Sequence, residues 1–151
     1  MALELYNEYA EALDMLDDDM RFEYIIDLGK AANEEPFPED FMRDENLMHG
    51  CMSRVWIIHT VEDGKHNFVG ESDAVIVKGL VSMMTKSFSG LTGQELAGIT
   101  LDHVRKLNLG ALTTQRQVGM MAMLKHMQKL AVVQHGGRQS HAQRFHARCF
   151  S

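Results

Sequence analysis

The residue best suited to chemistry in this sequence is Cys51, which lies in the run His49-Gly50-Cys51-Met52-Ser53. A cysteine reacts as its thiolate, so it needs access to solvent and a positive local field that favours the charged form. His49, Arg54 and Arg116 are the side chains that could supply that field. The glycine before Cys51 allows the backbone conformations of an exposed loop tip. A lone cysteine is also often a small buried hydrophobe, so its position alone leaves both interpretations open.

A cysteine–histidine hydrolase is the enzymatic alternative. It would need a histidine on the thiol and a third group that orients that histidine. The available histidines are His49, His59, His66 and His103. No local signature selects one of them, and a lone histidine is more often a surface or core polar residue.

A metal site could be sought near the C-terminus, where His141, His146 and Cys149 occur. Their spacing is loose and a fourth ligand is missing, so a solvated segment is the favoured interpretation. The glycine patterns of nucleotide-binding loops are absent from the sequence. We therefore expect neither a metal nor a cofactor bound by this chain.

Two cysteines in 151 residues are too few for a disulfide framework, and they fit a reducing compartment. A Cys51–Cys149 bond stays open at this point. The N-terminal residues 1–4 resemble neither a signal peptide nor a transit peptide. No apolar run reaches the roughly 20 residues that a membrane span needs. We therefore expect a cytoplasmic protein without a membrane partner.

Charge is distributed unevenly along the chain. Residues 1–45 carry 15 acidic and 3 basic residues, a net charge of −12, whereas residues 46–151 have a net charge of +6. No dense basic run with interleaved aromatic residues occurs, so nucleic acid is not an expected partner. A solvated helix face is the favoured explanation of the acidic half, and a docking surface for a basic partner is the alternative.

The cysteine directly precedes a predicted strand, 54–61, which is rich in Val, Trp and Ile. Apolar residues occupy both faces of this strand, so both faces should be at least partly covered. Asp63-Gly64 predicts a hairpin turn that leads to a second strand at 65–71. Residues 46–49 can add a short third strand. The cysteine would then lie between two strands of a small antiparallel sheet.

Helices are predicted around this sheet. An amphipathic helix at 2–16 is followed by N-cap candidates at Asp17, Asp18 and Asp19 and a second helix that ends near Gly29 or shortly after it. Residues 32–46 contain both prolines and predict an irregular connection. Helix 74–88 is apolar nearly all round and therefore central, with Ser72 or Asp73 as its cap. Gly79 within it suggests close backbone packing.

The last third of the chain predicts three more helices. Thr92 and Glu95 form a capping-box pattern, and Thr100 opens a further helix that should end near residues 108–110. The last long helix is predicted over 114–133, with a methionine stripe that is more typical of a core than of a cofactor site. The pattern stops at Gln134. Residues 1–133 are thus expected to form one domain, and residues 134–151 a disordered basic tail.

The segment from Asn46 to Trp56 resembles the SufE family of sulfur-acceptor proteins, which includes the related CsdE proteins. The segment matches the family pattern Asn-x-Val-x-Gly-Cys-x-Ser-x-Val-Trp except at the first valine of that pattern. Further blocks at 21–30, 38–46, 72–80 and 113–120 are similar to the family in the same order. Where family members often have a histidine and then Ser-Pro-Ser-Arg, this chain has Ala111 and then Thr113-Thr114-Gln115-Arg116. The resemblance covers residues 5–132.

The resemblance implies an α+β fold with a small antiparallel three-stranded sheet packed with helices, as in SufE and IscU. It implies that Cys51 accepts sulfur as a persulfide from a SufS/CsdA-like cysteine desulfurase, whose pyridoxal phosphate stays on that partner. The sulfur would then pass to a downstream iron–sulfur scaffold. We further expect Arg116 to stabilise thiolate or persulfide charge, Ser53 to donate a hydrogen bond, and His49 to contribute to the field.

Two alternatives remain at this point. The chain could activate the desulfurase by docking alone, without accepting sulfur. It could also be an iron–sulfur scaffold, although scaffolds hold clusters with several thiolates and only Cys51 lies in the region predicted to be structured. In the favoured case the chain is a sulfurtransferase-like carrier that works with a partner enzyme and has no independent turnover.

Overall fold

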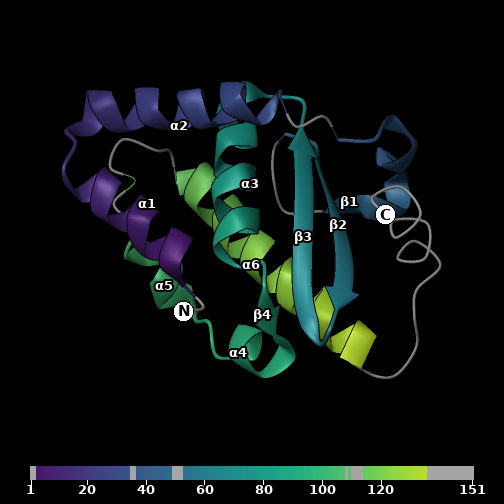
Figure 1. The fold of residues 1–151 in the computed structure, drawn as a ribbon. Helices are drawn as coiled ribbons and strands as arrows, with labels where there is room; N and C mark the ends of the chain where they lie inside the picture. The colour runs from purple at the N-terminus through teal and green to yellow at the C-terminus, as the bar shows by residue number, and fades with distance from the viewer. Residues whose placement is uncertain (1–2, 35–36, 49–52, 108, 110–113, 136–151) are drawn as a thin grey trace.

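The computed structural model describes residues 3–34, 37–48, 53–107, 109 and 114–135, and the side chains as far as Val132. The predicted α+β fold is confirmed, with helices packed around a small antiparallel sheet (Figure 1). Within the described part, buried hydrophobic side chains form one large core and a smaller second cluster. The tail predicted to begin at Gln134 lies almost wholly outside these ranges.

The first two helices form where the apolar spacing predicted them. Helix α1 spans Glu4–Asp14 and buries Tyr6, Tyr9 and Leu13. Helix α2 spans Asp18–Ala32, and the Asp17 side chain caps it by accepting a hydrogen bond of 2.9 Å from the Met20 amide. The cap satisfies an amide that has no partner inside the helix.

The sheet contains the three predicted strands and one more. Strands β1 (Leu47–Met48), β2 (Val55–Glu62), β3 (Lys65–Ser72) and β4 (Leu91–Thr92) lie in that order, and each neighbouring pair is antiparallel. The predicted turn at Asp63-Gly64 joins β2 to β3, and both of its residues have positive φ. Strand β4 was missed because two residues are too few to show an alternating pattern.

Both faces of β2 are covered, as its composition predicted. Val55 and Ile57 belong to the main core on one face. Trp56 and Ile58 lie on the opposite face and pack with Phe37 and Phe41. Phe37 and Phe41 precede β1, and Phe41 ends the first of two short 3-10 turns, η1 (Glu39–Phe41) and η2 (Asp44–Asn46). Alternate side chains of one strand thus meet two different hydrophobic clusters.

Helix α3 (Val75–Ser87) is the central helix, and it packs against β3 and crosses α2 closely. A methyl group added at Gly79 would overlap the carbonyl oxygen of Ile25, and one added at Gly29 would overlap the carbonyl oxygen of Val75. The close approach predicted at Gly79 is therefore confirmed, with Gly29 as its counterpart on α2. The predicted cap was wrong, because Ala74 is the N-cap and no side chain caps the helix.

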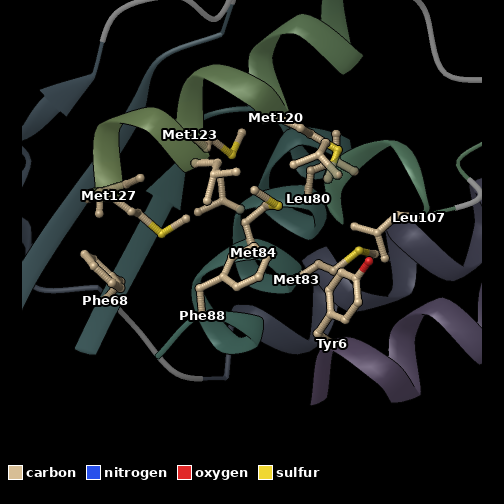
Figure 2. Close-up of a cluster of buried hydrophobic side chains, with 14 of the residues drawn as sticks. Tyr6, Phe68, Leu80, Met83, Met84, Phe88, Leu107, Met120, Met123 and Met127 are labelled. Carbon is tan, nitrogen blue, oxygen red and sulfur yellow. The ribbon is translucent and has the colours of Figure 1, made fainter. Parts of the chain in front are cut away.

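Three helices complete the fold. Helix α4 (Gly93–Ala97) has the predicted capping box of Thr92 and Glu95, and α5 (Leu101–Arg105) begins after Thr100 but ends earlier than predicted. Helix α6 runs from Thr114 to His135, two residues beyond its expected end. Figure 2 shows Met120, Met123 and Met127 of α6 facing Leu80 and Met84 of α3 and Phe88, the residue that follows α3. All three methionines are buried, which confirms that the methionine stripe is core.

Candidate functional site

The connection between β1 and β2 is the segment that contains the candidate cysteine. Leu47 pairs with Trp56 and Met48 pairs with Val55, so the two strands run side by side to the start of residues 49–54. Cys51 and His49 themselves lie outside the described residues. The structure therefore defines the two ends of this connection, Met48 and Ser53, rather than the thiol.

Ser72 fixes the second end of the connection. It is buried, lies opposite Val55 in the β2–β3 register, and donates a hydrogen bond of 2.8 Å from its hydroxyl to the carbonyl oxygen of Arg54. The same hydroxyl accepts a longer bond of 3.4 Å from the Ala74 amide at the start of α3. One buried side chain thus ties the backbone after the cysteine to the beginning of the central helix.

Arg54 places a positive charge three residues after Cys51 along the chain. Its guanidinium forms a 3.3 Å ion pair with Asp73 and lies 5.4 Å from the centre of the Trp56 ring. Both members of the ion pair are largely exposed, so it contributes at most about 1 kcal/mol. The contact with the Trp56 ring further stabilises the Arg54 guanidinium in this position, because the face of an aromatic ring attracts a cation.

Sequence reasoning took Ser72 or Asp73 for the cap of the central helix and missed the contacts of both residues with Arg54. A signal for these contacts was present in the chain. The two-residue turn at Asp63-Gly64 pairs Glu62 with Lys65, and counting back along both strands brings Arg54 opposite Asp73. The turn fixes the register of a hairpin, so the proximity of Arg54 and Asp73 follows from the predicted turn at Asp63-Gly64.

Ser53 and Arg116 are the other predicted site residues that the structure describes. Both are half-buried. Ser53 lies directly before Arg54, and Arg116 lies in the first turn of α6. Their arrangement relative to Cys51 and His49 falls outside the described ranges, so the proposed roles of Arg116 and Ser53 remain predictions.

Three of the four histidines considered for a hydrolase, His59, His66 and His103, have other contacts in the structure. His59 Nε2 and His66 Nδ1 are 2.8 Å apart across β2 and β3, and His59 also stacks on Phe68. His103 Nδ1 accepts a hydrogen bond from the Thr100 amide at 3.1 Å and so closes the capping box of α5. His59 is also four residues along β2 from Val55, or about 13 Å at the usual strand rise. These contacts favour structural roles for the three histidines.

The metal candidates His141, His146 and Cys149 fall outside the described part of the chain. Among the residues that the structure does describe, no group of three or more His, Cys, Asp or Glu side chains could hold a metal ion. Nor is any helix in that part both long enough and apolar enough to cross a membrane.

Comparisons with known proteins now identify the class to which this fold and cysteine belong. Residues 7–131 match the family model SufE, described as an Fe-S metabolism associated domain. Because that match covers most of the chain, the chain belongs to the SufE family.

Individual relatives agree with this assignment. An uncharacterized SufE-like protein of Synechocystis sp. is 36% identical over 113 residues, which cover 74% of this chain and 70% of that protein. An uncharacterized SufE-like protein of Rhizobium meliloti is 38% identical over 117 residues, covering 74% and 82%. SufE-like protein 1, chloroplastic/mitochondrial, of Arabidopsis thaliana is 36% identical over 115 residues, covering 74% of this chain and 30% of that longer protein.

A solved structure supports the fold. The solution structure of a hypothetical protein from Thermus thermophilus superposes with a TM-score of 0.69 and covers 88% of this chain and 99% of that one. The two sequences are 18% identical, so this likeness bears on the fold alone.

Proposed function

We propose that this chain accepts a sulfane sulfur atom on Cys51 from a SufS/CsdA-like cysteine desulfurase and passes it to iron–sulfur cluster assembly. Membership in the SufE family, which is associated with Fe-S metabolism, is the observation that carries the proposal. The position of Cys51 between two paired strands supports it, because a short connection between strands can present a side chain to a partner. Pyridoxal phosphate belongs to the partner enzyme.

The transfer is a thiol–persulfide exchange. The Cys51 thiolate attacks the outer sulfur of the donor's cysteine persulfide, a new sulfur–sulfur bond forms on Cys51, and the donor's own sulfur–sulfur bond breaks. The donor cysteine leaves as a thiolate, and the proton of the persulfide stays with the transferred sulfur or is lost to solvent. The bonds made and broken are alike, so the exchange is reversible and consumption by a downstream acceptor sets its direction.

Mass spectrometry of Cys51 after incubation with desulfurase and free cysteine tests this proposal. We expect Cys51 to gain the mass of one sulfur atom, and we expect Cys149→Ser to leave that gain unchanged. Cys51→Ser should abolish both the gain and any stimulation of desulfurase turnover. An unmodified Cys51 would overturn the proposal, and full stimulation by Cys51→Ser would show that docking alone accounts for the activity.

Arg116 allows a sharper test of how the sulfur is stabilised. A hydrogen bond to a charged group contributes about 1.5–3 kcal/mol, so Arg116→Gln should slow sulfur loading of Cys51 by roughly tenfold to a hundredfold. Arg116→Lys keeps the charge and should recover part of the rate. The loading rate is measured together with the melting temperature. Equal rates for all three proteins would exclude a role for Arg116 in the transfer.

A further inference from the structure

Polar side chains form a connected network at the end of β3, next to the connection that contains Cys51. Ser72, the last residue of β3, makes hydrogen bonds through both its hydroxyl and its amide. The hydroxyl donates to the Arg54 carbonyl oxygen at 2.8 Å, and the amide donates to Oε1 of the Glu71 side chain at 2.9 Å. Ser72 therefore joins the backbone that follows Cys51 to a carboxylate on β3.

The Glu71 carboxylate extends this network to two helices. Nζ of Lys78, in α3, lies 2.9 Å from Oε1 of Glu71 and donates a 3.1 Å hydrogen bond to its Oε2. Lys78 also donates to Oδ1 of Asn33, the C-cap residue of α2. Figure 1 shows the ends of α2 and β3 and the start of α3 on the same side of the molecule. We call Ser72, Glu71, Lys78 and Asn33 the anchor network.

The ion pair within the anchor network is mostly shielded from water. The side chains of Glu71 and Lys78 are 13% and 14% exposed, whereas those of the ion pair between Asp102 and Arg105 are 69% and 61% exposed. Burial removes hydration from both charges, so an apolar pair of similar volume is often at least as stable as a buried ion pair. Directional hydrogen bonds, unlike apolar contacts, select one arrangement of the groups that they join. The network is thus better suited to fixing geometry than to adding stability.

The geometry that this network fixes is that of the backbone next to the cysteine. Ser72 lies opposite Val55 in the β2–β3 register, and Cys51 is three residues before Arg54 in the chain. A transfer between two sulfur atoms requires them to meet at contact distance and in line. A misplacement of about 1 Å caused by a distant substitution can slow a reaction by about a hundredfold. Residues that fix the Arg54 backbone can therefore affect the transfer rate without touching the thiol.

We propose that Ser72, Glu71 and Lys78 are positioning residues that hold the connection containing Cys51 in place for sulfur transfer. Ser72 fixes the backbone of Arg54, Glu71 fixes Ser72, and Lys78 fixes the carboxylate of Glu71. The inference rests on the proposed function of Cys51. The three residues act through the backbone and make no bond to the transferred sulfur.

The rate of sulfur loading on Cys51, measured by mass spectrometry at several desulfurase concentrations, tests Ser72. Ser72→Ala should lower the maximal loading rate by about tenfold and leave the half-saturating desulfurase concentration unchanged, because no surface side chain is altered. Ser72→Thr keeps the hydroxyl and should recover most of the rate. Asp102→Asn/Arg105→Gln removes an ion pair outside the network and should load sulfur like the unaltered chain. An unchanged maximal rate in Ser72→Ala would overturn the proposal.

Substitutions at Glu71 and Lys78 separate positioning from stability. Lys78→Met leaves a buried carboxylate without its cation and should lower the melting temperature. Glu71→Leu/Lys78→Met replaces the pair with apolar side chains and should recover the melting temperature, but it should load sulfur as slowly as Ser72→Ala. Adding Ser72→Ala to this double variant should cause little further loss, because residues of one network are not additive. Recovery of both the melting temperature and the loading rate in the double variant would overturn the proposal.

Amide hydrogen exchange of the full chain without desulfurase distinguishes this inference from the proposed function. Ser72→Ala should speed exchange in residues 49–56 by roughly twofold to tenfold, as expected for the loss of one hydrogen bond, and should leave residues 118–130 of α6 unchanged. Equal exchange in the two proteins would overturn the inference, whether or not Cys51 accepts sulfur. An unaltered chain that gains no sulfur on Cys51 would instead overturn the proposed function.

Discussion

Tyr6 joins two distant parts of the chain through one hydroxyl group. Its side chain is buried against Phe88, and its O–H donates a 2.8 Å hydrogen bond to the carbonyl oxygen of His103. Burial raises the pKa of this phenol above 10.0, because the phenolate would lose its hydration. The folded state therefore binds this proton more tightly than the unfolded state does.

The stability of the protein should fall in alkaline solution for this reason. The contribution of Tyr6 is complete below its unfolded pKa of 10.0 and is lost as the pH rises towards its higher folded pKa. Tyr6→Phe should cost about 0.5–1.5 kcal/mol at neutral pH through the lost hydrogen bond, and should lose less stability than the parent above pH 10. Urea unfolding of both proteins at neutral pH and above pH 10 measures these differences in stability. Parallel losses in the two proteins would contradict the assignment.

At the scale of elements, the crossing of α2 and α3 depends on Gly29 and Gly79. Each of these glycines packs directly against the backbone of the other helix. Gly79→Ala would force the helices apart at Ile25, and we expect a loss of about 1–3 kcal/mol, as for overpacked cores. Gly98→Ala is the control, because the nearest atom to its added methyl is the Glu95 carbonyl oxygen at an ordinary 3.4 Å. Thermal unfolding should separate the two variants clearly. Equal melting temperatures would show that the crossing tolerates a side chain.

Helices and strands were predicted well from the sequence where apolar residues recur periodically over a long stretch or where a strong turn signal occurs. Helices α1 to α3 and α6, the β2–β3 hairpin and the capping box at Thr92 were all recognisable in this way. Strand β4 and the early end of α5 could not be predicted in this way. Such short segments show no hydrophobic periodicity, so tertiary packing determines where they begin and end. The His59–His66 pair joins two strands diagonally and has no local signature. The cysteine was identified from composition and motif, whereas the contacts of Ser72 and Asp73 with Arg54 required the strand register.

At the scale of the whole molecule, the described core closes before the chain ends. Its last buried residue is Ala131, and the large cluster extends back to Tyr6. We therefore expect a chain that stops at His135 to melt within about 2 °C of the full chain at low protein concentration, less than a change of 1 kcal/mol would produce. Calorimetry of the two proteins measures this. A much lower melting temperature would mean that residues 136–151 belong to the folded domain.

The two-sided packing of β2 also limits how far Cys51 can lie from the sheet. Met48 and Val55 are held in the main core, while Trp56 beside them is held in the second cluster on the opposite face of the sheet. Cys51 is three residues from Met48, and consecutive Cα atoms are 3.8 Å apart, so the Cα of Cys51 can never lie more than about 11 Å from that of Met48. Cys51 must therefore lie close to the end of β1. If Cys51 carries sulfur as proposed, the donor and the acceptor would each have to approach this end of the sheet, one after the other.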